Sequence, residues 1–172
     1  MPFAESAPLG PRWTADGGPY TAGAALRPLA TASGPVGAFV CGEALFPSVA
    51  RDLARAGAVL LANPSNDHWF GAEAGAEQHL RVARLRAIEN RRWLVRPTTT
   101  GVSAVIDPQG RVVTRSRAGG PEVLAATVRR SEEVTPVQRW GDAPVLAGCG
   151  ILGFSSWRGA RGSRGARKGD AG

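Results

Sequence analysis

Twelve residues decide the fold: Val36–Pro47, read VGAFVCGEALFP. Its first half, Val36–Cys41, is a short apolar run typical of a buried strand. Gly42 permits a sharp turn, and Pro47 suits the first turn of a helix that the apolar spacing extends to Ala56. Strand, turn and helix in this order indicate an α/β unit.

Outward from this unit, the same signals alternate along the chain. A second buried strand is predicted at Val59–Ala62, and the apolar stripe of Glu73–Arg91 predicts the longest helix. A turn at Asp107–Gly110 predicts a hairpin. The sequence thus predicts a mixed α/β domain whose sheet is covered by helices. The further predicted strands are Trp93–Pro97, Val102–Ile106, Arg111–Arg115 and Val123–Val128.

Length and charge limit the functional classes. The chain has 172 residues, 43% of them hydrophobic, which suffices for one domain with a real core. The net charge is +7, but the segment from Arg158 onward holds five basic side chains against one acidic, a net of +4. Only +3 remains on the body, so its charge does not indicate nucleic-acid binding. The Arg/Gly-rich tail keeps nucleic-acid binding open as an alternative.

The two cysteines, Cys41 and Cys149, form no C-x-x-C pair, and His68 and His79 are not spaced as zinc ligands with them. We therefore expect no disulfide framework and no metal. Gly148–Gly153 matches G-x-G-x-x-G, but no strand–turn–helix unit surrounds it and no acidic residue follows at the required distance. No dinucleotide or other cofactor is predicted.

Cys41 is the candidate nucleophile. A cysteine in an apolar run is usually a small core residue. Here, however, it ends a strand, and the carboxyl ends of strands are where reacting groups gather in α/β sheets. The Gly42 turn can expose the sulfur and direct a backbone N–H at a developing oxyanion. Glu43 either reaches the same site or forms an ion pair.

Three other features have a plain structural reading beside the functional one. In the loop Asn63–Gly71, Asn66 and Asp67 can bond their own backbone to build a turn. Trp69 and Phe70 either wall the pocket beside Cys41 or plug the core. His79 could be a general base by type, but helix packing is the simpler reading.

Four longer strings together resemble the apolipoprotein N-acyltransferase family, whose soluble domain belongs to the nitrilase, or carbon–nitrogen hydrolase, superfamily. The resemblance runs from Pro2 to about Trp157. It implies part of a nitrilase-like α-β-β-α sandwich. The strings are VCGEALFP (40–47), NPSNDHWFG (63–71), EQHLRVARLRAIENRRWLVRPTTTGVSAVIDPQGRV (77–112) and TPVQRWGDAPV (135–145).

The resemblance also implies a reaction. An acyl chain would pass from a membrane phospholipid to Cys41 as a thioester, and then to the N-terminal cysteine amine of a lipoprotein. Glu43 and Glu5 would be supporting carboxylates, and Trp69 and Phe70 would lie near the substrate. Gly42 departs from the family, which usually has an aromatic residue there. The triad's lysine and general-base glutamate would precede Pro2, so the chain as written is expected to be a partial, inactive acyltransferase.

The expected organisation has three parts: a partial carbon–nitrogen hydrolase domain (1–143), an apolar remnant of a membrane helix (144–157) and a basic tail (158–172). The implied location is the bacterial inner membrane, with the domain on the periplasmic side and the tail in the cytoplasm, in agreement with the positive-inside rule. The rival readings are a soluble amidase-type hydrolase and a nucleic-acid-binding protein that uses the tail.

Overall fold

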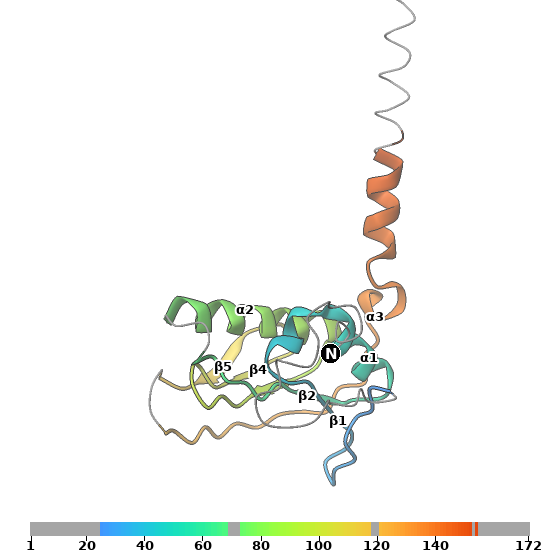
Figure 1. Ribbon diagram of the computed structural model, residues 1–172. Coiled ribbons are helices and arrows are strands. Elements are labelled where there is room, and N and C mark those ends of the chain that lie inside the picture. Colours follow the sequence, from blue (N-terminus) through green and yellow to red (C-terminus); the bar gives the residue numbers. More distant parts are fainter. Residues whose placement is uncertain (1–24, 69–72, 118–120, 153, 155–172) are drawn as a thin grey trace, which may run out of the picture.

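The computed structural model describes residues 25–68, 73–117, 121–152 and 154, and in them a five-stranded sheet lies beside two main helices (Figure 1). The helices are α1 (Pro47–Arg55) and α2 (Glu73–Asn90), with a 3-10 helix η1 (Cys41–Leu45), a short α3 (Pro136–Trp140) and a helix over 143–152. The strands are β1 (Val36–Ala38), β2 (Leu60–Ala62), β3 (Leu94–Arg96), β4 (Ala104–Ile106) and β5 (Val112–Arg115).

The strands follow one another across the sheet in chain order. β1, β2 and β3 are mutually parallel, whereas β4 and β5 are each antiparallel to the strand before. The carboxyl ends of the three parallel strands therefore meet at one edge. The segments that leave this edge carry the candidate site.

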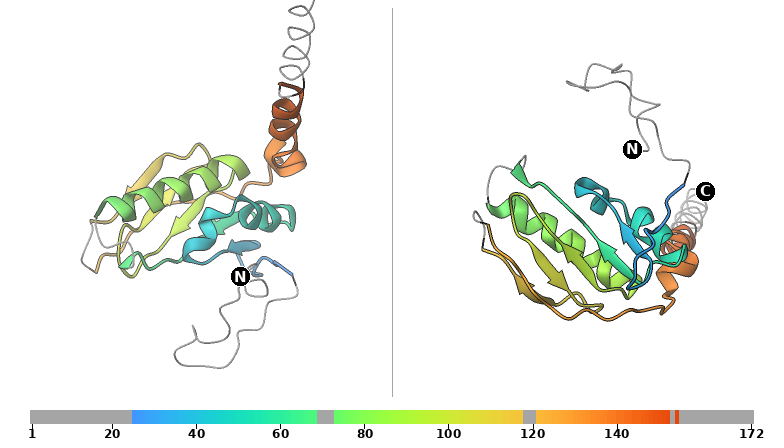
Figure 2. Two further views of the ribbon diagram at one scale, coloured as in Figure 1. Left: turned by 45° about the horizontal axis from the view of Figure 1, so that its top comes forward. Right: turned by 90° about the horizontal axis from the view of Figure 1, so that it is seen from below.

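One face of the sheet forms the core against α1 and α2 (Figure 2). Gly37, Leu61 and Leu94 share this face, since they stand opposite one another in the register. A Cβ on Gly37 would lie 3.0 Å from the Cβ atoms of Leu53 and Ala58, so glycine allows α1 to approach β1 closely. The largest apolar side chains buried here are Phe39, Leu53, Leu61, Leu80, Leu94 and Ile106.

The opposite face is less covered. Its residues on β1 and β2 (Val36, Ala38, Leu60 and Ala62) are only partly buried, while Gly37 and Leu61 between them are buried. One helical layer and one sheet are thus present in the described residues. This is the α/β arrangement that the sequence predicted, and it amounts to part of a four-layer sandwich.

The expected elements are confirmed with one exception. The predicted strand Val123–Val128 is wrong: this segment is coil, and Val123 is 95% exposed. Its Val and Thr residues match strand propensity, but a strand also needs a neighbour to complete its hydrogen-bond ladder. Further along the chain, the Ser131 N–H donates to Val59 O, just before β2, at 3.2 Å.

The expected apolar segment 144–157 is helical as far as it is described, and it projects away from the body (Figure 1). Val145, Leu146 and Ile151 are each more than two-thirds exposed on this helix. None of the helices in the described ranges is long and apolar enough to cross a membrane. The basic tail 158–172 lies outside the described residues.

Candidate active site around Cys41

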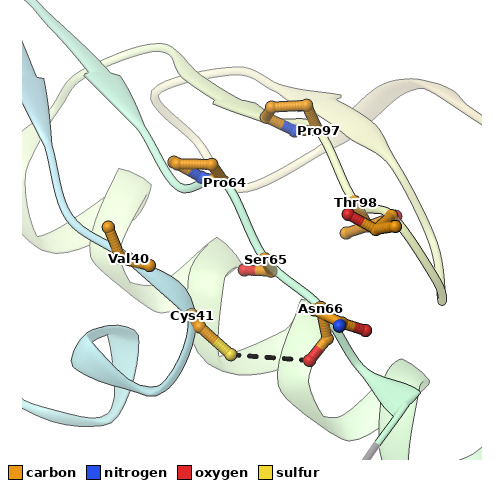
Figure 3. Close-up of a pocket in the computed structure, with 8 residues that line it drawn as sticks. Val40, Cys41, Pro64, Ser65, Asn66, Pro97 and Thr98 are labelled. Carbon is orange, nitrogen blue, oxygen red and sulfur yellow. Dashed lines mark hydrogen bonds between the residues drawn. The ribbon is translucent and has the colours of Figure 1, made fainter. Parts of the chain in front are cut away.

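A cavity of about 440 Å³ opens at the edge where the parallel strands end. Its walls come from the segments after β1, β2 and β3, and Figure 3 shows Cys41 between Val40 and Asn66. None of its lining side chains carries a formal charge at neutral pH. They are Val40, Cys41, Pro64, Ser65, Asn66, Pro97, Thr98 and Thr99.

Cys41 occupies an unusual backbone conformation, with φ at +47°. Left-handed φ is uncommon for residues other than glycine and is worth attention where it occurs. The Cys41 N–H donates to Pro64 O at 2.8 Å, and the thiol donates to Asn66 O at 3.6 Å (Figure 3). The strand therefore ends in an elbow that turns the sulfur into the cavity mouth.

Glu43 stabilises this elbow through the backbone of Val40, the residue before Cys41. Its carboxylate Oε2 accepts from the Val40 N–H at 2.6 Å, and its own N–H donates to Val40 O at 2.9 Å. Of the two roles left open for Glu43, neither an ion pair nor a position in the cavity wall is found among the described residues. Its carboxylate instead caps the start of η1.

Two buried side chains contact the carbonyl oxygen of Cys41. His79 Nε2 lies 3.1 Å from Cys41 O, and Asn63 Nδ2 donates to the same oxygen at 3.4 Å and to Phe39 O at 2.9 Å. His79 comes from α2 and is 3% exposed, and Asn63 follows β2 and is fully buried. His79 is buried in α2, as its predicted packing role requires. Its ring also contacts the backbone of Cys41, the candidate nucleophile.

Asp67 departs from the expected turn role. Asn66 behaves as predicted, since its Oδ1 accepts from His68 N–H at 3.1 Å. Asp67 is instead 5% exposed, and its Oδ1 lies 2.8 Å from His79 Nδ1. A buried carboxylate needs a charged or hydrogen-bonded partner, so its side chain points inward rather than to its own backbone.

That partner includes Arg96, which sequence analysis did not identify. It lies on β3, is fully buried, and donates from Nη2 to both carboxylate oxygens of Asp67 at 2.9 and 3.0 Å. Its Nη1 donates to Asn63 Oδ1 and to Ser65 Oγ, the latter at 2.9 Å. An arginine within a predicted buried strand was the available signal, because such a side chain must be paired inside.

The remaining predicted site residues are only partly visible. Glu5, Trp69 and Phe70 lie outside the described residues, so their roles stay predictions. Gly42 is the second residue of η1, directly after Cys41, and a Cβ there would meet nothing within 4 Å among the described residues. The described residues therefore leave space for the first atom of a side chain at this position.

Comparison with known proteins agrees with this geometry. The model of the carbon–nitrogen hydrolase family matches residues 2–135. A carbon–nitrogen hydrolase from Helicobacter pylori G27 shares the fold, with a TM-score of 0.51 at 20% identity over 58% of this chain and 42% of its own. Saccharomyces cerevisiae Nit3, of branch 10 of the nitrilase superfamily, gives 0.52 at 26% identity over 59% and 40%. The chain belongs to the carbon–nitrogen hydrolase family.

Within that family, the relatives confirm the narrower resemblance. The chain is 34% identical over 161 residues to the apolipoprotein N-acyltransferase of Geobacter metallireducens, covering 92% of this chain and 31% of that protein. It is 39% identical over 127 residues to the enzyme of that name from Pseudomonas putida, covering 73% and 25%. The chain thus spans about a third or less of the length of the curated relatives that it matches.

Proposed function

We propose that this chain carries the nucleophile of an apolipoprotein N-acyltransferase, and that Cys41 accepts the acyl chain as a thioester. The observation that carries this proposal is the elbow. A cysteine with left-handed φ, at the carboxyl end of a parallel strand, turns its sulfur into an open cavity. The relatives named apolipoprotein N-acyltransferase support the choice of reaction.

The reaction has two steps. The Cys41 sulfur attacks the ester carbonyl of a phospholipid; the C–S bond forms, the C–O bond breaks, and the lysophospholipid leaves with a proton. The amine of a lipoprotein's N-terminal cysteine then attacks the thioester. The C–N bond forms, the C–S bond breaks, and the thiol is regenerated.

Proton transfer needs groups that the described cavity does not supply. None of its lining residues is acidic or basic, and the thiol is bonded to a backbone carbonyl, Asn66 O. An ordinary thiol has a pKa near 8.5, so it is a weak nucleophile at neutral pH without a base or a cation. We propose that a glutamate and a lysine from outside the described residues complete the site.

The proposed acyltransferase function also implies a location for the protein. The exposed apolar helix 143–152 would lie against the bacterial inner membrane, with the domain on the periplasmic side. The phospholipid donor and the lipoprotein acceptor would both be found there.

The test follows the covalent intermediate. Membranes from cells that express the protein are incubated with a phospholipid carrying a radiolabelled acyl chain, and the label on the protein is measured before and after hydroxylamine. When the proposed glutamate and lysine complete the site in these membranes, we expect a hydroxylamine-sensitive label that Cys41→Ala abolishes. Cys149→Ala is the matched control and keeps the label, because Cys149 is exposed on the helix 143–152, apart from the cavity.

Two results would contradict the proposal: a label of undiminished size in Cys41→Ala, or no label from phospholipid together with ammonia release from small amides. The second result would favour the amidase-type alternative.

A further inference from the structure

We propose that Asp67, His79 and Arg96 form a positioning network that holds the Cys41 carbonyl, and with it the elbow on which the thiol reacts. This inference rests on the proposed role of Cys41 as nucleophile. It assigns a role to three buried side chains that line no part of the cavity.

The three side chains form a continuous series of contacts that begins on β3 and ends at the elbow. Arg96 binds both oxygens of Asp67, Asp67 Oδ1 contacts His79 Nδ1 at 2.8 Å, and His79 Nε2 contacts Cys41 O at 3.1 Å. Arg96 Nη2 also lies 3.0 Å from His79 Nδ1. The imidazole ring is therefore oriented at one nitrogen and holds the backbone of the nucleophile with the other.

The hydrogen on Nε2 of His79 is assigned by the partner of that nitrogen. A backbone carbonyl can only accept a hydrogen bond, so Nε2 must carry the hydrogen in the contact with Cys41. His79 directs this nitrogen at the carbonyl oxygen, whereas the Cys41 thiol is bonded to Asn66 O. His79 is thus a positioning residue in this geometry and not the base that ionises the sulfur.

A packing role alone does not account for the composition of the network. Charged groups are costly to bury, and a paired set is often no more stabilising than apolar residues of similar volume. The network lies 0–5% exposed, under a residue whose φ of +47° is uncommon for a side chain larger than glycine. The Cys41 N–H donates to Pro64 O, and the Cys41 carbonyl accepts from Asn63 and His79, so both backbone groups of this residue are held.

Two substitutions at His79 separate the two ends of the ring. In His79→Gln, the amide nitrogen can take the place of Nε2 and keep the bond to Cys41 O. In His79→Asn, the shorter amide can take the place of Nδ1 and keep the contact with Asp67 while it loses the one with Cys41. Both are made in Cys149→Ser, so that Cys41 is the single thiol of the chain.

Acylation is followed with p-nitrophenyl butyrate on the full chain at about pH 8.5, where an ordinary thiol is half ionised. Sulfur attacks the ester carbonyl and p-nitrophenolate leaves, so its absorbance reports the rate. We expect His79→Asn to slow acylation about tenfold or more, because small misplacements of a reacting group cost this much, and His79→Gln to stay within about threefold of the parent. Gln138→Ala, a buried residue that bonds Asn90 O away from the cavity, is the control for lost stability and should acylate as the parent does.

The outcomes divide clearly once each variant is shown to unfold cooperatively. A slow Asn variant beside a Gln variant near the parental rate supports the network, and a Gln variant as slow as the Asn variant would contradict the role given to the contact between Nε2 and Cys41 O. An Asn variant with the parental rate overturns it.

A second measurement uses the unsubstituted chain. The 15N shifts of the His79 ring should show a protonated Nε2, and an unprotonated Nε2 in the folded protein would refute the contact. If the parent itself is not acylated at Cys41, the proposed function fails, while the ring measurement still decides the network.

Discussion

At the scale of the residue, the position of Asp67 in the site depends on the absence of a side chain at Gly101. Gly101 has φ at +99°, and a Cβ there would lie 2.8 Å from the Cβ of Asp67. Gly57 has nearly the same φ, +98°, but nothing lies within 4 Å of the equivalent position. The two glycines thus share a positive φ that would strain any other residue, and they differ in the space around them.

This difference gives a prediction with an internal control. Gly57→Ala should lower the free energy of unfolding by about 1–2 kcal/mol, the cost of left-handed φ for alanine. Gly101→Ala should cost a further 1–3 kcal/mol or so, because the methyl group must displace Asp67. Chemical denaturation measures both. Equal losses in the two variants would mean that the loop at Gly101 relaxes without disturbing Asp67.

At the scale of the element, most helices and strands follow from local signals. The apolar stripe of Glu73–Arg91 and the turn at Asp107–Gly110 correspond closely to α2 and to the β4–β5 hairpin. Pro47 opens α1 as expected. Val123–Val128 failed because pairing depends on a partner strand, which no local window reveals.

Between the elements lies a charged cluster on the helical side. Glu89 of α2 is within hydrogen-bond distance of Arg86, at 3.2 Å, while its second oxygen has no partner among the described residues. Burial raises the pKa of Glu89 above its usual range; Asp142 adds to the rise, and Arg86 and Arg51 oppose it. Burial likewise lowers the pKa of Arg86, against the opposing effect of Glu89 and Asp142.

The raised pKa of Glu89 predicts a pH dependence of stability. Because the folded state binds this proton more tightly than the unfolded state, the contribution of Glu89 to stability is fully present below its unfolded pKa of about 4.3 and is lost as pH rises through the folded value. Glu89→Gln should remove this slope in denaturation curves taken across that window. Asp52→Asn serves as the matched control, because Asp52 lies on the exposed side of α1 and its variant should keep the slope. An unchanged slope in Glu89→Gln would contradict the assignment.

At the scale of the whole molecule, the body and the projecting helix have different surfaces. The body buries its apolar residues between α1, α2 and the sheet. The helix 143–152 leaves Val145, Leu146 and Ile151 exposed along its length. Apolar surface of this kind marks a site for a membrane or a partner protein.

The proposed membrane location makes this helix the contact. Leu146→Ser with Ile151→Ser should reduce sedimentation of the protein with phosphatidylethanolamine–phosphatidylglycerol vesicles by about tenfold or more, because each apolar side chain contributes about 1.5–3 kcal/mol when buried. Ala147→Ser, an exposed change on the same helix, should bind as the parent does. Equal binding by the double variant, or no binding by the parent, would contradict the location.

The sequence by itself determined the order of the elements, the fold class, the family and the candidate nucleophile, because these depend on periodicity, turn residues and contiguous motifs. Only the tertiary structure decided the surroundings of Cys41: the left-handed elbow, the capping role of Glu43 and the buried path from Arg96 to the Cys41 carbonyl. The members of that path come from β3, from the loop after β2 and from α2, up to 55 positions from Cys41 along the chain. Hydrogen bonds between such distant segments exist only after the parallel strands align their carboxyl ends at one edge, and no local pattern encodes that alignment.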